Sequence, residues 1–306
     1  MTHVPPSPGL TNWIRIIVIA IIWGGAFGTV RLALETFPPT SVAAYRILIG
    51  ALALYALMRW KGISFPDFTD KRLWAMMIWI AVLSTALPFF LLGWGQQHVP
   101  SAFAGMSMAV VPLFVLPLAH IFVPGEQMSL RKSLGFGIGF IGTVVLIGTS
   151  GLGRIDGPIE FWARAACVTA SICYAANSIV TKKCPPVNEL ALSTVALMLA
   201  SIVMVPLALF VDGVPTKVTW EGGLSILYLG LIPTALAFII KVAVIRSAGP
   251  SFMSLTNYQV PVWSVLFGLL FWSEALPPQL FVALLLIFTG IAISQWATLR
   301  RLFSRS

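Results

Sequence analysis

The residues of this sequence that could do chemistry are hydrogen-bonding groups placed deep inside long apolar stretches. Tyr174 and Asn177 are three positions apart, and Ser254, Asn257 and Tyr258 have a spacing that places them on one helix face. Polar groups at such depth are costly unless they face a cavity or another helix. We interpret the asparagines and tyrosines as candidate cavity residues that would bind a small molecule. Bonding between helices is the commoner role of serines and threonines, and this alternative applies to Ser84 as well.

Aromatic side chains extend this group. Trp23 and Trp263 lie in the middle of apolar stretches, and Trp94 lies toward the end of another. Such rings could form the wall of a site for planar or apolar substrates, or for cations that bind to ring faces. Packing against lipid is the alternative.

Two cations lie inside apolar stretches. Arg46 is about 12 Å into its stretch at the rise of a helix, and its own stretch offers no acidic partner. We expect it to bind a carbonyl, a helix C-terminus or a substrate carboxylate, and we favour structural pairing. Lys241 is nearer to the end of its stretch, and we expect its amine to reach the membrane surface.

The residues that several other kinds of chemistry require are absent from the apolar stretches. No acidic residue lies near the middle of an apolar stretch, and Glu126 and Glu274 lie at the ends of theirs, so a carboxylate proton relay has no carrier. The pattern Gly137–Gly142 matches a dinucleotide fingerprint but lies inside one apolar run without the required strand and turn. We interpret it as a groove for a neighbouring helix, or less favourably as a dimer face. No cofactor, metal or catalytic group is expected.

Composition identifies the elements that must position these residues. The chain has 306 residues, of which 58% are hydrophobic and 9% charged, whereas soluble domains are about 25% charged. This excludes most soluble enzymes and nucleic-acid binders, and it makes the lipid bilayer the expected partner. We predict an all-α integral membrane protein with ten transmembrane helices at 13–34, 38–60, 72–97, 100–122, 131–150, 159–181, 188–211, 221–246, 250–272 and 278–299.

The distribution of cations predicts the orientation of these helices. The net charge is +9, and most cations fall in the connections on one side of the predicted membrane, including Arg59, Lys61, Lys71, Arg72, Arg131, Lys132, Lys182 and Lys183. Cytoplasmic connections carry such an excess. Both termini are therefore expected in the cytoplasm, and a bacterial inner membrane fits this pattern.

Landmarks recur in the same order in the two halves of the chain. Pro88 corresponds to Pro233, and further pairs are Pro38 with Pro185, Pro112 with Pro261, Glu126 with Glu274 and Gly142 with Gly290. Five helices per half is an odd number, so the halves would insert as inverted repeats around a central cavity. We assign 13–150 and 159–300 to the repeats, 1–12 and 301–306 to cytoplasmic termini, and 151–158 to a periplasmic linker.

The paired prolines interrupt corresponding helices of the two halves. Such interruptions indicate a transport site, with Pro88 and Pro233 as hinges. Kinks that merely shape the bundle are the alternative.

These motifs resemble the EamA-type repeat of the drug/metabolite transporter superfamily. The resemblance rests on Trp23–Phe27 (WGGAF), Arg46, the run from Pro112 to Glu126, and Gly142, and again on Pro261, Glu274 and Gly290, while Tyr174 stands where the second tryptophan is expected. The chain as a whole is most similar to the YddG-type exporters of amino acids. The resemblance implies ten helices around a cavity lined by both halves, and it places Trp23, Ser84, Tyr174, Asn177, Asn257, Tyr258 and Trp263 in that location.

We therefore expect a secondary transporter that exports small amphipathic metabolites, foremost amino acids including aromatic ones, by alternating access. A drug or organic-cation exporter of the same fold is the nearest alternative, and a channel is a more distant one. Proton coupling and facilitated diffusion both remain open, as do the exact substrate and a monomeric or dimeric state.

Overall fold

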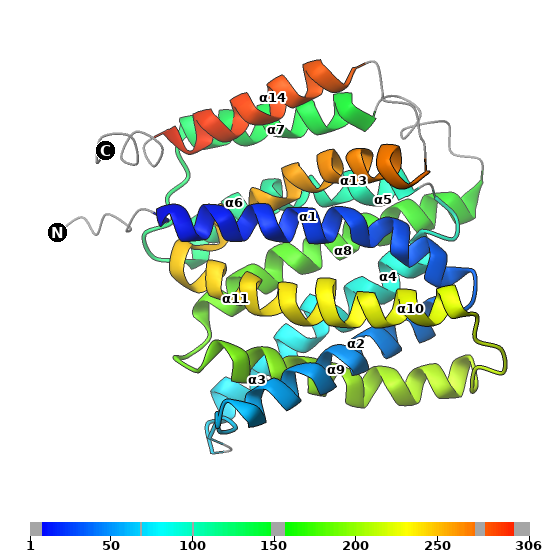
Figure 1. Ribbon diagram of the computed structural model, residues 1–306. Coiled ribbons are helices and arrows are strands. Elements are labelled where there is room, and N and C mark those ends of the chain that lie inside the picture. The colour runs from blue at the N-terminus through cyan, green and yellow to red at the C-terminus, as the bar shows by residue number, and fades with distance from the viewer. Residues whose placement is uncertain (1–7, 68, 100, 148–156, 273–278, 297–306) are drawn as a thin grey trace.

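The computed structural model describes residues 8–67, 69–99, 101–147, 157–272 and 279–296, and all regular structure in these ranges is helical. Its helices are α1 (Gly9–Leu34), α2 (Pro39–Trp60), α3 (Lys71–Ala81), η1 (Val82–Ala86), α4 (Leu87–Gly95), α5 (Ser101–Met108), α6 (Val111–Phe122), α7 (Leu130–Ile147), α8 (Pro158–Lys183), α9 (Glu189–Val211), α10 (Trp220–Leu229), η3 (Gly230–Leu236), α11 (Ala237–Ala248), α12 (Pro250–Ser254), α13 (Thr256–Trp272) and α14 (Leu280–Ser294) (Figure 1). The expectation of an all-helical protein is confirmed. The expected cytoplasmic C-terminus, Glu274, most of the linker and most of the N-terminal segment lie outside the described residues.

Six helical stretches of the described chain are long and apolar enough to cross a membrane. They are Gly9–Leu34, Pro39–Trp60, Lys71–Gly95, Pro158–Lys183, Glu189–Val211 and Trp220–Ala248. The other predicted segments coincide with the shorter helices α7 and α14 and with the interrupted pairs α5–α6 and α12–α13. The chain is thus a multi-pass membrane protein, and ten crossings stay a prediction.

Two kinds of residue mark the helix starts: side chains that accept hydrogen bonds from free backbone N–H groups, and prolines, which have no backbone N–H. The Asn188 side chain accepts hydrogen bonds from Leu190 N at 2.9 Å and Ala191 N at 3.3 Å, and so caps α9. Asp70 and Thr219 cap α3 and α10 in the same way. Proline occupies the first turn of α2, α8 and α12, where its missing N–H removes no helical hydrogen bond.

Both prolines predicted as hinges accompany π-helical segments. Pro88 lies two residues after the end of η1 within the Lys71–Gly95 stretch, and Pro233 lies inside η3 within the Trp220–Ala248 stretch. Proline removes a backbone donor, and the chain adjusts by widening the neighbouring turn. Matching helices of the two halves are therefore interrupted at matching places, whereas motion about them stays a prediction.

Contacts between helices have the same pattern in both halves. Helix α1 packs on α10, α11 and α13 of the second half, and α8 packs on α3, α4, α5 and α6 of the first. Two further contacts pair equivalent helices, α2 with α9 and α7 with α14. Helices α1 and α8 begin at opposite ends of the bundle, and α14 ends where α1 begins (Figure 1). The two halves thus interlock with opposite direction.

The predicted glycine groove holds α7 against α14. A methyl group on Gly135 would lie 2.6 Å from Gly290 O and Ser294 N, and one on Gly142 would lie 2.8 Å from Ile287 N. Gly135 and Gly142 therefore pack inside the chain, as the favoured interpretation expects, whereas Gly137 meets nothing within 4 Å.

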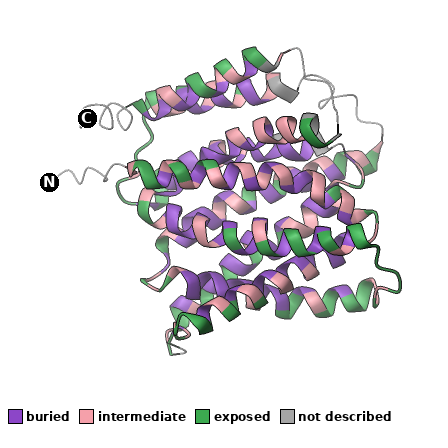
Figure 2. Cartoon of the chain, viewed as in Figure 1, coloured by how far each residue is buried: buried purple, intermediate pink, exposed green. Residues whose placement is uncertain are grey.

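The outer surface of the bundle is apolar. Buried residues face the interior and exposed ones the outside (Figure 2), and Phe210 and Phe281 are 89% and 79% exposed. An apolar exterior around a packed interior suits a lipid environment.

Close packing of α7 on α14 predicts different effects for two glycines of one helix. Gly135→Ala should destabilise the protein by about 1–3 kcal/mol because its methyl group meets backbone atoms of α14. Gly137→Ala is the control, because its methyl group would meet nothing within 4 Å. The higher helix propensity of alanine should stabilise this variant by up to about 1 kcal/mol. Thermal unfolding of the detergent-solubilised protein measures both variants, and equal melting temperatures would contradict the groove.

Candidate functional site

A cavity lies between the two halves of the bundle. It measures about 1090 Å³, including the part that opens outward, and both π-helical segments and helices of both halves line it. Small-molecule sites often lie between the helices of bundles. The cavity has this position.

The greater part of the cavity wall is apolar and aromatic. Trp23 and Phe27 of α1 line it together with Phe89 of α4, Tyr174 of α8 and Phe238 of α11. The indole N–H of Trp23 donates a hydrogen bond to Pro233 O at 3.3 Å, which links α1 to η3. Rings from four helices can bury an apolar or aromatic body.

Amide side chains supply neutral polar groups. Asn177 Oδ1 accepts a hydrogen bond from Thr181 Oγ1 at 3.4 Å, and Asn257 Nδ2 donates one to Ser254 O at 3.1 Å. Among the described residues, the opposite end of each amide has no hydrogen bond, and both asparagines line the cavity. An amide N–H and an amide oxygen are thus available to a ligand.

Two buried cations provide the charge of the site. Arg46 Nε donates a hydrogen bond to Thr234 Oγ1 at 3.1 Å, and the Lys241 amine donates to the hydroxyl of Ser84. No acidic side chain is among the residues that line the cavity. Within the described part of the chain, the cavity is therefore electropositive.

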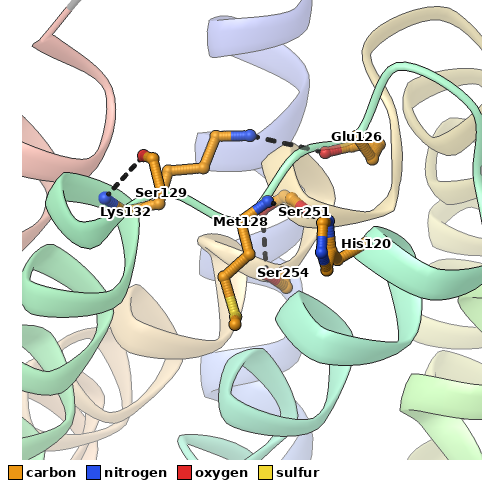
Figure 3. A network of polar contacts seen from close by, with 7 residues as sticks. All are labelled: His120, Glu126, Met128, Ser129, Lys132, Ser251 and Ser254. Carbon is orange, nitrogen blue, oxygen red and sulfur yellow. Dashed lines mark hydrogen bonds and ion pairs between the residues drawn. The ribbon is translucent and has the colours of Figure 1, made fainter.

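Polar contacts within the loop between α6 and α7 order this loop, which lies beside α12 (Figure 3); the last residue of α12, Ser254, lines the cavity. Lys132 Nζ lies 3.6 Å from Glu126 Oε2, and Met128 N donates a hydrogen bond to His120 Nδ1 at 3.4 Å. Partly exposed contacts of this kind contribute little stability. Their role is to position the loop.

The structure brings most of the predicted site residues together at the cavity. Its wall contains Trp23, Arg46, Ser84, Tyr174, Asn177 and Asn257, and Pro233 lies there too. Trp94, Tyr258, Trp263 and Pro88 are not part of the wall. Ligand binding by the wall residues stays a prediction.

Tyr258 is placed against α7 instead of the cavity. Its hydroxyl donates a hydrogen bond to Phe136 O at 2.8 Å, its ring packs on Gly139, and 1% of the residue is exposed. Because α13 turns this face toward the glycines of α7, the expected cavity position of Tyr258 is corrected to helix packing.

The two tryptophans outside the wall also have packing partners. A methyl group on Gly24 would lie only 2.5 Å from the Cβ of Trp263, so the two helices are in close contact there. The Trp263 ring is 6.5 Å from the Phe267 ring. The Trp94 ring meets that of His98 edge-on at 5.3 Å. Pro88 is buried beside η1. These three residues lie outside the cavity wall in this structure, while substrate binding by Trp94 and Trp263 and a hinge at Pro88 stay predictions.

Lys241 corrects the sequence prediction in the opposite sense. It was expected to reach the membrane surface, but only 6% of the residue is exposed, and it lines the cavity. Sequence reasoning also missed Phe89, Phe238, Thr234 and Gln96. Phe89 directly follows Pro88, so proximity to the paired prolines was the available signal for this one.

The fold and cavity define a class: integral membrane proteins with a cavity at the centre of a helical bundle. The EamA-like transporter family model matches the chain twice, at residues 13–148 and 161–296. This chain belongs to that family, which is a transporter family and not an enzyme family.

Named relatives and a solved structure agree with the assignment. Transporter YoaV of Bacillus subtilis is 24% identical and covers 94% of this chain and 97% of its own. Inner membrane transporter YedA of Escherichia coli K12 is 26% identical, with 83% and 80% covered. The probable terminal-alkyne amino-acid exporter of Streptantibioticus cattleyicolor is 23% identical, with 94% of each chain covered. A crystal structure with TM-score 0.75 and 21% identity covers 95% of this chain and 98% of its own, and it supports the fold.

Two serines of α8 test the position of the cavity. Ser178 lines it, whereas Ser171 is fully buried and donates a hydrogen bond to Ser107 O at 2.6 Å. In a background with Cys167, Cys173 and Cys184 replaced by alanine, Ser178→Cys should react with N-ethylmaleimide about tenfold faster or more than Ser171→Cys, because reaction requires access. Mass spectrometry of the purified protein measures both rates, and equal rates would contradict the cavity.

Proposed function

We propose that this protein is a secondary transporter that exports small amphipathic metabolites, foremost amino acids including aromatic ones. The observation that carries the proposal is the cavity between the two halves, where an aromatic wall adjoins Arg46 and two asparagines. The rings suit an apolar side chain, and the polar groups suit the charged end of an amino acid. A relative named as an amino-acid exporter supports this substrate class.

The proposed mechanism is alternating access by two inverted repeats of five helices, at 13–150 and 159–300. The double family match and the interlocking contacts of the two halves support this division. We propose ten crossing helices, and the helical segments of each half support this count. The π-helical segments at Pro88 and Pro233 are the proposed hinges, since each can change its hydrogen bonding at low cost.

The charge of the cavity favours amino acids over organic cations. An organic-cation exporter benefits from an acidic group or an open aromatic cage, but the charged wall residues are Arg46 and Lys241. Facilitated diffusion is the proposed mode, because no acidic wall residue is available to carry a proton.

The proposed orientation in a bacterial inner membrane has both termini in the cytoplasm. The end of the bundle where α1 begins also holds the connection between α2 and α3, which Arg59, Lys61, Lys71 and Arg72 flank, and the junction of α8 and α9, which carries Lys182 and Lys183 (Figure 1). An excess of cations is typical of cytoplasmic connections.

Uptake into proteoliposomes tests the function. Labelled phenylalanine and leucine should enter saturably, at a rate that a pH gradient leaves unchanged. Phe27→Ala should weaken phenylalanine uptake more than leucine uptake, because it removes a ring of the aromatic wall.

Protein-free liposomes and the Phe210→Ala variant, changed on the outer surface, are the controls. Absence of uptake for any amino acid would overturn the substrate class. Uptake that requires a pH gradient would overturn facilitated diffusion.

A matched pair of lysines tests the orientation. Lys61 and Lys217 are both exposed and lie in connections at opposite ends of the bundle. In the cysteine-free background, a membrane-impermeant maleimide applied to intact spheroplasts should label Lys217→Cys at once and Lys61→Cys only after permeabilisation. The reverse pattern would contradict the orientation.

A further inference from the structure

The cavity wall carries an excess of positive charge that the proposed function does not yet explain. Its wall contains two cations, Arg46 and Lys241, and no acidic residue. The acidic residues that the structure describes all lie in loops or at helix ends. Neither cation forms an ion pair within the described part of the chain.

Lys241 is held in the cavity by a single hydrogen bond. Its amine donates to the Ser84 hydroxyl of η1 and lies 4.2 Å from the centre of the Phe238 ring. An ammonium group has three N–H donors, so two are left for a ligand. The ring face compensates only part of the lost hydration.

Arg46 has a similar environment on the opposite helix. Nε donates to Thr234 Oγ1 in η3, and the guanidinium lies 3.8 Å above the Phe89 ring. Among the described residues, the two terminal nitrogens have no hydrogen-bond partner. A guanidinium with free terminal nitrogens can bind both oxygens of a carboxylate.

Each cation thus belongs to one half of the chain and bonds to a hydroxyl in the π-helical segment of the other half. Arg46 and Lys241 are only 7% and 6% exposed. Buried charges are costly unless an opposite charge accompanies them, and nothing described in the wall supplies one. An anion that enters the cavity meets positive charge in the wall, whereas an amine meets only like charge.

We propose that Lys241 and Arg46 together form the anchor for a substrate carboxylate, which makes the carboxylate the group that the site requires and the ammonium group dispensable. This rests on the proposed function and specifies its substrate class. Organic acids without an amino group should bind at least as well as the matching amino acid, and amines should not bind.

Three ligands of similar size test this on the purified, detergent-solubilised protein. They are 3-phenylpropionate, with a carboxylate alone; L-phenylalanine, with both groups; and 2-phenylethylamine, with an ammonium alone. Ligand-induced thermal stabilisation measures binding without transport. The first two should stabilise the wild-type protein and the amine should not; stabilisation by the amine alone, or equally by all three, would overturn the proposal.

Variants assign the effect to Lys241. Lys241→Met should weaken 3-phenylpropionate binding about tenfold or more, since a charge-assisted hydrogen bond is lost, and Lys241→Arg should retain most of it. The control is Lys183→Met, because Lys183 also lies near a ring, that of Phe122 at 5.6 Å, but at the exposed end of α8. Equal weakening by both methionine variants would overturn the role of Lys241. If Lys241→Met does not fold, the ligand series on the wild-type protein still decides whether the carboxylate is the group that the site requires.

The outcomes separate this inference from the proposed function. Binding of 3-phenylpropionate that depends on Lys241, without phenylalanine uptake, would support the carboxylate anchor and overturn amino-acid transport. Phenylalanine uptake with binding that is indifferent to the carboxylate would support the transporter and overturn the anchor.

Discussion

Two positive charges buried in an apolar bundle are the constraint on which the rest of this structure depends. A guanidinium and an ammonium inside a membrane protein require a polar pocket, partners or a counter-ion. Arg46 and Lys241 each donate one hydrogen bond to a hydroxyl group and each lie over the face of one aromatic ring. The helices around them leave a cavity at this point, and we propose that the charge of that cavity selects the substrates.

The partners of the two cations come from the irregular parts of the bundle. Ser84 and Thr234 both lie in π-helical segments, which accompany Pro88 and Pro233. The prolines therefore do more than bend their helices, because the widened turns carry the hydroxyl groups that the cations bind. Trp23 reinforces the arrangement through its bond to Pro233 O. Away from the cavity, the glycines of α7 and α14 allow backbone contact, so this pair packs tightly without lining the open centre.

Much of this could be predicted from the sequence. Apolar length located the helices, and recurrence of prolines located both interruptions, because these signals are local and repeat in the two halves. Trp23, Tyr174 and Asn177 were found because polar or amphipathic groups deep in an apolar helix must face the interior. Tyr258 satisfies the same rule, but its neighbour is Gly139 of α7, and helix periodicity cannot say which neighbour a face meets.

Lys241 shows that sequence alone also cannot say whether a side chain reaches the membrane surface or points into the bundle. It lies about 10 Å from the end of its helix at 1.5 Å per residue, close enough for a long side chain to reach the surface. Its direction depends on η3, which shifts the helical phase ahead of it. Phe238 gave no signal of its own, since phenylalanines are frequent throughout the chain.

An experimental structure with a bromine-labelled substrate would test the central claim most directly. We predict that 4-bromophenylalanine soaked into crystals gives its anomalous peak between the aromatic wall residues, with density for its carboxylate against Arg46 and Lys241. A bromine peak outside this cavity, or a carboxylate turned away from both cations, would contradict the account.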